Sequence, residues 1–378
     1  MTARSRRRTF VPPRLARRIF IAPLVPVATL LGIALFPVEL AAVAVASRYL
    51  PGRLKAPRLL WVVMLWLVRE SIGIVLLFAL WLASGCGWRL RAPPFRRQHV
   101  RLISWYLWGV IGTAQRSLGL RLVTEESPGT LVVEPHLTSR PLLVLSRHAG
   151  AGDSLILAHE LVNTYGRTPS VVLKDTLKWA PCLDVILHRL PNRFIPPNPP
   201  PGAGVVESIG ALAARLPDDG ALILFPEGGN FTESRRQRAI QRLVERGLHA
   251  EAVKARGLSM VLPPRPGGTL AALASARHAD VVFVAHTGLE HLSSMRQVLE
   301  GVPMGHSVRM AWWLVRAEDI PQGEEARIVW LFDWWNRIDE WVRAHAEAGL
   351  QPATRLSPEP GPAPVAARPR RRRPPRSG

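Results

Sequence analysis

Apolar residues form two long runs near the start of the chain. The first run covers residues 19–47 and contains one acid, Glu39, while the second covers residues 59–87 and contains one charged pair, Arg69-Glu70. Each run exceeds the roughly 20 residues that a helix needs to cross a bilayer. The pattern therefore predicts a two-helix membrane hairpin over residues 19–88, in which Glu39 and Arg69 lie at similar depth and form an ion pair. The alternative is that these charges extend to the membrane interface or face the domain that follows.

Basic residues on both sides of the hairpin predict its orientation. Residues 1–18 carry seven arginines and no acid, and five arginines lie between residues 89 and 101. By the positive-inside rule, both outer flanks face the cytoplasm. The link at residues 48–58 is also basic, so a re-entrant or interfacial hairpin is a second interpretation. Cleavage after Ala44-Val-Ala46 is disfavoured because the apolar stretch is longer than a signal core.

Shorter apolar runs follow from residue 99 onward. Residues 99–123 read as an amphipathic helix, either at the bilayer surface or packed on the domain. Strand-like runs then alternate with helical ones. The predicted strands are residues 141–146, 171–173, 221–225, 261–262 and 281–285. The predicted helices are residues 154–163, 205–216, 235–255, 269–276 and 327–345. This alternation predicts an α/β fold with a mostly parallel central sheet flanked by helices, preceded by the N-terminal membrane helical hairpin.

The charge of the chain favours anionic partners. The formal net charge is +21, and part of it lies in residues 352–378, a Pro- and Arg-rich stretch that we expect to be a disordered tail. With a hairpin anchor, anionic membrane lipid is the expected partner, and nucleic acid is not expected. The two cysteines, Cys86 and Cys182, cannot form a disulfide framework, which favours a reducing compartment. The sequence has no Cys/His cluster with metal-ligand spacing.

His148 and Asp153 are the first candidates for catalysis. His148 directly follows a predicted strand, and a link with two glycines separates it from Asp153. Side chains five apart in a continuous helix diverge by about 140°, whereas a glycine-bearing turn lets the carboxylate meet the imidazole. A histidine oriented by a carboxylate is a general base near neutral pH. The alternative is a helix N-cap beside a surface histidine.

Two further segments follow predicted strands. Phe225-Pro-Glu227-Gly228 places an acid at a strand end, although for this motif by itself a turn with a solvated glutamate is the favoured interpretation. Residues 261–268, Val-Leu-Pro-Pro-Arg-Pro-Gly-Gly, precede a helix, and backbone amides at a helix N-terminus suit an anion. A rigid turn is the alternative.

Taken in order, these elements resemble the lysophospholipid acyltransferase superfamily, which includes the 1-acylglycerol-3-phosphate acyltransferases. The superfamily shows His-x-x-x-x-Asp, a basic Phe-Ile segment, Phe-Pro-Glu-Gly and a proline motif; the matching residues here are His148/Asp153, Arg193-Phe194-Ile195, Phe225 to Gly228 and Leu262-Pro263. Residues 174–181 look like its Leu-Lys-Trp-x-Pro segment, and Phe-Thr-Glu at 231–233 is similar to the lysocardiolipin-type branch. The resemblance covers roughly residues 100–300.

The resemblance implies direct transfer from an acyl thioester to a lipid hydroxyl. His148 takes the hydroxyl proton, Asp153 orients the imidazole, and backbone amides at residues 150–152 stabilise the oxyanion. Glu227 is expected to bind the glycerol of the acceptor. The full set of expected substrate-binding residues is Glu227, Gly228, Arg193, Arg235, Arg236, Lys178 and Pro263. No cofactor is expected, because acyl-CoA or acyl carrier protein is a co-substrate.

Three departures from the superfamily pattern concern the acceptor. Gly229-Asn230 stands where relatives have Thr-Arg, Pro196-Pro197 where they have a basic residue, and Arg147 where many have Asn. Lysophosphatidate is therefore only the default acceptor, with Arg193, Arg235 or Arg236 as replacement phosphate ligands. A lysophospholipid with a larger headgroup, or an acceptor without a phosphate monoester, are the alternatives.

The expected organisation is a basic cytoplasmic N-terminus at 1–18, the hairpin at 19–88, an acyltransferase domain at 99–347 and the tail at 352–378. Because the acyl donor is cytoplasmic, we expect the protein in the cell membrane with its catalytic domain facing the cytoplasm. The alternative function is a non-catalytic basic membrane protein, with a decayed acyltransferase fold, that binds anionic lipid.

Overall fold

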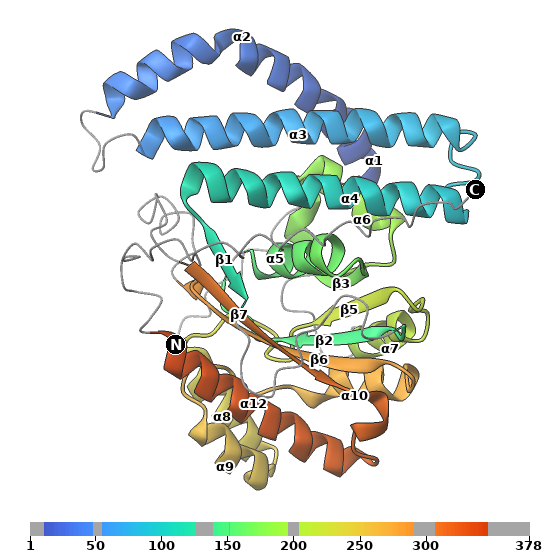
Figure 1. Ribbon diagram of the computed structural model, residues 1–378, viewed down its shortest axis with the longest axis vertical. Coiled ribbons are helices and arrows are strands. Elements are labelled where there is room, and N and C mark those ends of the chain that lie inside the picture. Colours follow the sequence, from blue (N-terminus) through green and yellow to red (C-terminus); the bar gives the residue numbers. More distant parts are fainter. Residues whose placement is uncertain are drawn as a thin grey trace, which may run out of the picture.

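The computed structural model describes residues 11–47, 55–124, 139–150, 152–195, 204–290 and 307–346 (Figure 1). The predicted tail and residues 1–10 lie outside this part. The N-terminal helical elements are α1 (Arg14–Ala16), the π-helix η1 (Arg17–Ile21), α2 (Ala22–Ala46) and α3 (Lys55–Ala83). Arg14–Ala46 and Lys55–Ala83 are long and apolar enough to cross a membrane, which agrees with the hairpin prediction and weakly suggests membrane association.

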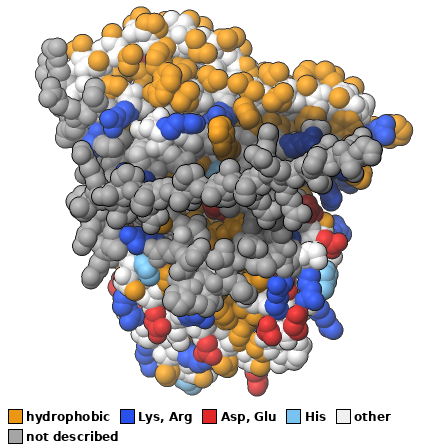
Figure 2. Space-filling view, in the orientation of Figure 1, with side chains coloured by type: hydrophobic (Ala, Val, Ile, Leu, Met, Phe, Trp, Pro, Cys, Tyr) orange, Lys and Arg blue, Asp and Glu red, His pale blue; other side chains and the backbone are white. Residues whose placement is uncertain are grey.

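The hairpin lies along the rest of the molecule. Figure 1 shows a bent α2 stacked on α3, and α3 stacked along α4 (Pro93–Thr113). Pro26 and Pro37 lie inside α2, where proline removes backbone hydrogen bonds and bends a helix. In α3, Glu70, Gly73 and Leu77 are buried on the side of the domain, and Met64 is buried against Gly32 of α2. Large apolar side chains of the hairpin are exposed on the side away from the domain (Figure 2).

The predicted ion pair between Glu39 and Arg69 does not form. The Arg69 guanidinium instead lies 5.4 Å from the ring centroid of Trp105 and fills the space above Gly109, both in α4. Glu70 also points to the domain, where its carboxylate accepts hydrogen bonds from the Tyr106 hydroxyl and from the Cys182 amide, the latter at 2.9 Å. The charges of α3 therefore connect the hairpin to the domain instead of connecting its two helices.

Seven strands form one sheet in the order β1-β7-β6-β2-β5-β3-β4. Their bounds are β1 Arg121–Thr124, β2 Leu142–Ser146, β3 Thr168–Lys174, β4 Arg193–Ile195, β5 Gly220–Leu224, β6 Asp280–Thr287 and β7 Ser307–Val315. Strands β6, β2, β5, β3 and β4 are mutually parallel, β7 is antiparallel to β6, and β1 is parallel to β7. The mostly parallel α/β prediction is confirmed.

Helices cover both faces of this sheet. One face packs against α4, α5 (Asp153–His159) and α6 (Pro181–Arg189), with Val144, Val282 and Leu157 in the shared core. The other packs against α7 (Val205–Ala213), α10 (Pro266–Ser275) and α12 (Glu324–Ala346), with Phe283 stacked on Trp334 at 4.4 Å. Residues of β2 and β5 are buried throughout, as expected for parallel strands covered on both faces.

Several local predictions need correction. The predicted helix 235–255 is two helices, α8 (Glu233–Glu245) and α9 (His249–Gly257), separated at Gly247, which has φ +73°. Residues 261–262 are buried but form no strand. Strands β1, β4 and β7 were not predicted from the sequence. Helix α4 begins six residues before the predicted start and packs on the domain, as one of the two interpretations expected.

Candidate active site

The candidate residues collect at the carboxyl ends of adjacent strands. His148 follows β2, Glu227 follows β5 and His286 lies near the end of β6, and β2 pairs with both of the other strands. Parallel strands present functional groups together at this edge of a sheet. The sheet topology thus brings His148 together with residues that lie 79 and 138 positions further along the chain.

His148 and Asp153 are in direct contact. The Nδ1 atom of His148 lies 2.8 Å from Oδ2 of Asp153, and the Phe225 ring lies 4.7 Å from the imidazole. Gly152 has φ +106°, a conformation that favours glycine, and it lets the chain turn into α5 with Asp153 at its first position. The His148 side chain is 13% exposed and that of Asp153 is fully buried. The imidazole therefore reaches solvent while its partner does not.

The Asp153 carboxylate is also held by the backbone. It accepts hydrogen bonds from the amides of Ala149, at 2.8 Å, and Gly150, at 3.1 Å. Burial raises the pKa of Asp153, but neighbouring His286 and the hydrogen bonds from His148 and Gly150 lower it overall. The carboxylate is thus ionised and fixed. The Gly150 amide, expected at the oxyanion, is already used by Asp153.

Glu227 joins two loops of the site. Its side chain is buried, Oε1 accepts from the His148 amide at 3.0 Å, and Oε2 accepts from the Leu262 amide at 2.9 Å. Gly228, with φ +67°, completes the turn after it. Burial raises the pKa of Glu227 to about 8, despite the charge of Arg147 and both amide hydrogen bonds. Both oxygens face the protein, so contact with an acceptor stays a prediction.

A buried polar network behind the histidine was not predicted. The Arg147 guanidinium donates to the His286 carbonyl at 2.7 Å and to Glu290 at 2.8 Å. His286 Nε2 lies 3.1 Å from the Arg147 carbonyl and 3.9 Å from Asp153 Oδ2. Burial lowers the pKa of His286 below its ordinary value, although the carboxylate of Asp153 opposes this effect. No periodicity in the sequence distinguishes such a buried arginine from a surface one.

A polar cavity lies beside the His148 loop. Its volume is about 290 Å³, and its lining is Ala149, Asn230, Phe231, Thr232, Arg235 and Glu290. The Phe231 amide donates to the His148 carbonyl at 3.1 Å, which fixes the loop against this wall. Arg235 is exposed and donates to the Asn230 carbonyl at 2.9 Å. Within the described chain, the buried Oδ1 of Asn230 has no hydrogen-bond partner.

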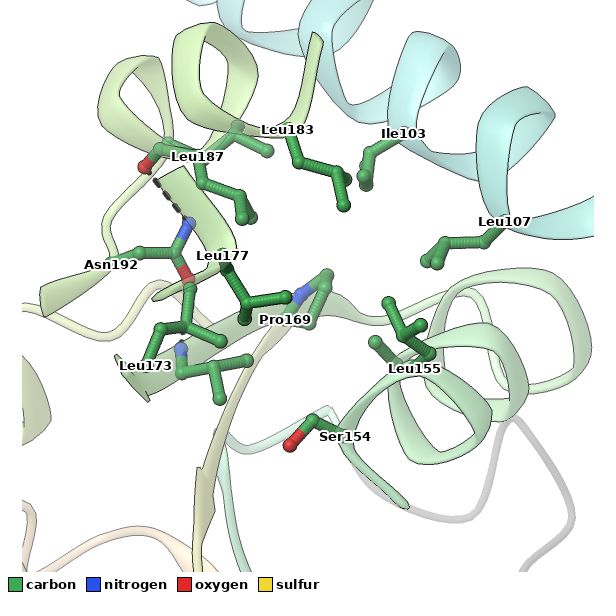
Figure 3. Close-up of a pocket in the computed structure, with 13 residues that line it drawn as sticks. Ile103, Leu107, Ser154, Leu155, Pro169, Leu173, Leu177, Leu183, Leu187 and Asn192 are labelled. Atoms are coloured by element: carbon green, nitrogen blue, oxygen red, sulfur yellow. Dashed lines mark hydrogen bonds between the residues drawn. The ribbon is translucent and has the colours of Figure 1, made fainter. Parts of the chain in front are cut away.

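An apolar cavity lies between α5 and the helices α4 and α6. Figure 3 shows leucine and isoleucine side chains from α4, α5 and α6 pointing toward one another, with Ser154 at one edge. Its volume is about 40 Å³. Ser154 directly follows Asp153, so this cavity begins next to the candidate catalytic pair.

The other predicted substrate ligands are dispersed. Arg235 lines the polar cavity, and Pro263 follows Leu262 beside Glu227. Arg236 binds Glu233 and the Leu258 carbonyl, away from that cavity. Lys178 lies 4.9 Å from the Phe194 ring centroid, and Arg193 is in β4. Because β5 and β3 separate β4 from β2, Arg193 starts roughly 15 Å from the histidine strand.

The described residues contain no group of three or more His, Cys, Asp or Glu side chains able to hold a metal ion. The contacts observed at the sheet edge are those of a histidine, a carboxylate and backbone amides.

Residues 130–295 match the family model described as Acyltransferase. The match includes His148, Asp153 and Glu227, and it supports an acyltransferase. No curated protein and no solved structure matches the chain. The acyltransferase match supports the transfer of an acyl group in general, and it leaves the donor and the acceptor open.

Proposed function

We propose that this acyltransferase moves an acyl group from a thioester, acyl-CoA or acyl carrier protein, to a hydroxyl of a lysophospholipid. The observation that carries the proposal is the contact of His148 Nδ1 with the buried Asp153 carboxylate. Because Nδ1 of His148 contacts Asp153, the Nε2 atom of the partly exposed imidazole remains available to a substrate. Such a pair fits proton removal from a neutral hydroxyl.

In the proposed reaction, Asp153 accepts a hydrogen bond from Nδ1–H, so the free electron pair is on Nε2. Nε2 takes the proton of the acceptor hydroxyl while its oxygen bonds to the thioester carbonyl carbon. The carbon–sulfur bond then breaks, and the thiolate receives the proton from Nε2. Ser146 takes no covalent part, since its hydroxyl is buried and lies 3.0 Å from the Arg147 carbonyl.

Glu227 acts as a positioning residue in this proposal. Its two oxygens hold the amides of His148 and Leu262, and therefore fix the histidine loop against the proline loop. Asp153 fixes the same loop through Ala149 and Gly150. Holding a base in place is a large part of catalysis, because small displacements of reacting groups are costly.

The polar cavity is the proposed place for the acceptor headgroup. Arg235 supplies a positive charge there, and its Nη1 lies 3.5 Å from the position of a Cβ added to Gly229. This is an ordinary contact distance, so Arg235 lies directly beside the segment where relatives carry Thr-Arg. A guanidinium is a good ligand for phosphate, so lysophosphatidate remains the default acceptor.

The apolar cavity is the proposed place for an alkyl chain. Its lining is almost wholly hydrocarbon, and it begins at the residue after Asp153. Its volume of about 40 Å³ is smaller than an alkyl chain, so binding requires the surrounding leucine side chains to move.

For the hairpin, the proposed arrangement is insertion into one leaflet from the cytoplasmic side. One face of α3 is buried on α4 and α6, and large apolar side chains of α2 and α3 are exposed on the other side. Because one face of α3 packs against the domain, lipid cannot surround this helix on all sides. A cytoplasmic domain is consistent with a cytoplasmic acyl donor.

The test is an acyl-transfer assay of the full chain purified in neutral detergent. Labelled acyl-CoA and labelled acyl carrier protein are each offered with lysophosphatidate, lysophospholipids with larger headgroups, and an acceptor without phosphate. The proposal predicts product with at least one lysophospholipid. Absence of product from every pair would contradict the proposal and favour the non-catalytic lipid-binding alternative.

A further inference from the structure

Basic side chains gather where η1 crosses α6, away from the candidate active site. Arg17 is buried and makes two hydrogen bonds to Asp184 of α6, from Nη2 at 2.9 Å and from Nε at 3.1 Å. This paired contact fixes the first turns of the chain against α6. It also uses both oxygens of the Asp184 carboxylate.

Four more basic residues surround that ion pair, and we call them the basic cluster: Arg14, Arg18, His188 and Arg189. The charges of Arg14, Arg17 and Asp184 all act on Arg18, and those of Arg14 and Arg18 act on His188. Arg17 is paired with Asp184, and His188 Nδ1 also lies 3.2 Å from Oδ1 of this carboxylate. Three arginines, Arg14, Arg18 and Arg189, remain close together. Such a group favours an anion.

Arg18 has buried hydrogen-bond donors that no described residue satisfies. Its Nε and Nη2 atoms are buried, and neither has a hydrogen-bond partner in the part of the chain that the structure describes. A buried guanidinium nitrogen without a partner costs free energy. An oxygen ligand with negative charge would satisfy both atoms at once, in the two-point geometry that arginine offers to phosphate.

Arg189 of α6 is the second arginine that an anion at the basic cluster would contact. One of its guanidinium nitrogens donates to the Leu77 carbonyl at 2.9 Å and lies 3.1 Å from His99 Nε2, so the side chain is held in place. Burial, reinforced by the charge of Arg18, lowers the pKa of Arg189 to about 10. Arg18 and Arg189 therefore repel each other, and an anion between them would relieve this repulsion.

The basic cluster lies next to exposed apolar side chains, as expected for a site that binds a lipid headgroup. Arg14 and Arg18 alternate with Leu15, Ile19 and Phe20, which are large apolar side chains with more than half of their surface exposed. Figure 2 shows Lys and Arg side chains along the border of the hydrophobic upper part of the molecule. Phosphate groups of a bilayer lie at such a border between apolar and charged side chains.

We propose that the basic cluster binds the phosphate of an anionic phospholipid headgroup, separately from acyl transfer. The lipid would contact Arg18 and Arg189 while its alkyl chains lie along the exposed apolar residues of η1. This inference depends on membrane placement of the hairpin and not on the identity of the acyl acceptor.

The experiment measures thermal unfolding of the full chain in neutral detergent, with three added ligands at constant ionic strength. These are a short-chain phosphatidylglycerol, a short-chain phosphatidylcholine and inorganic phosphate. A ligand that binds only the folded state raises the unfolding temperature. The expected result is a larger rise with phosphatidylglycerol than with the other two ligands. An equal rise with inorganic phosphate would overturn the lipid assignment.

Matched variants separate the cluster from the rest of the positive charge. Arg18→Gln should weaken the apparent affinity for phosphatidylglycerol about fivefold, as expected for one charge near a lipid phosphate. Arg18→Lys should retain most of it. Arg238→Gln removes one exposed charge from α8, on the far side of the sheet, and should behave as wild type. Equal affinities of wild type and Arg18→Gln, or an equal loss in Arg18→Lys and Arg18→Gln, would overturn the proposal. Acyl transfer by the same samples is measured in parallel. Failure of the lipid-binding proposal can then be distinguished from failure of the proposed acyl-transfer function.

Discussion

The Nδ1 atom of His148 lies 2.8 Å from Oδ2 of Asp153, across a turn that contains Gly150 and Gly152. The same carboxylate accepts hydrogen bonds from two backbone amides of this turn. Asp153 therefore orients the imidazole and shapes the loop that carries it. Loss of the carboxylate should affect the tautomer of the histidine and the position of the histidine together.

Asp153→Asn tests the orienting role. The amide retains one acceptor oxygen for the backbone but loses the charge that favours Nδ1–H, so we expect acyl transfer to fall roughly 10²-fold or more. The measurement is the transfer rate at saturating donor, with thermal unfolding of the same sample to verify the fold. A folded variant with the wild-type rate would contradict this role.

Glu227 should make stability depend on pH. Burial raises the pKa of Glu227 to about 8 in the folded protein, above the roughly 4.3 of a glutamate in an unfolded chain. Between these values the unfolded chain releases a proton that the folded protein keeps. Stability from this group is therefore present below pH ~4.3 and is lost as pH rises toward 8, by a few kcal/mol at most.

Glu227→Gln removes this titration. An amide nitrogen would face the His148 or Leu262 N–H, so we expect a loss of about 1–3 kcal/mol at low pH. Unfolding temperatures from pH 4 to pH 9 should then fall less steeply in the variant than in wild type. Parallel curves for the two proteins would show that Glu227 does not titrate in this window.

Gly109→Ala tests the contact between hairpin and domain. A Cβ at Gly109 would collide with the Arg69 guanidinium, so the guanidinium must leave its place over Trp105. We expect a loss of about 1 kcal/mol, because the flexible arginine side chain can move but gives up its contact with the Trp105 ring. Gly257→Ala is the control, because nothing lies within 4 Å of its added Cβ. Thermal unfolding in detergent should separate the two, and equal unfolding temperatures would contradict the packing described.

Leu155→Ala tests the apolar cavity. Shortening this lining residue of α5 enlarges the cavity, so we expect long acyl donors to gain rate relative to short ones. The measurement is the ratio of transfer rates for a long-chain and a short-chain acyl-CoA. Leu248→Ala, at an exposed leucine outside the cavity, serves as the control. An unchanged ratio in Leu155→Ala would remove the cavity from chain binding.

The sequence predicted the parallel strands that carry the site, because buried strands read as continuous apolar runs ending in turn residues. It did not predict β7, in which Arg309 interrupts an apolar stretch that contains Trp312 and Trp313, or β4, which has only three residues. The sequence predicts an ion pair between Arg69 of α3 and Glu39 of α2, because the two residues lie at similar depth in a bilayer. The actual partners of Arg69 and Glu70 depend on tertiary packing; they are Trp105, Tyr106 and Cys182.

For the site, local spacing was sufficient to suggest the contact between His148 and Asp153. It was insufficient for Glu227, whose role depends on two loops from distant parts of the chain. The network of Arg147, His286 and Glu290 was missed for the same reason.

The most direct test of the central claim is acyl transfer by His148→Ala. The exposed His249 in α9 provides a matched control, His249→Ala, with the same change of side chain far from the sheet edge. Both variants should remain folded and associated with membranes. The account predicts that His148→Ala loses at least about 10²-fold in transfer rate, while His249→Ala retains the wild-type rate. Substantial transfer by folded His148→Ala would contradict the assignment of this histidine as the base.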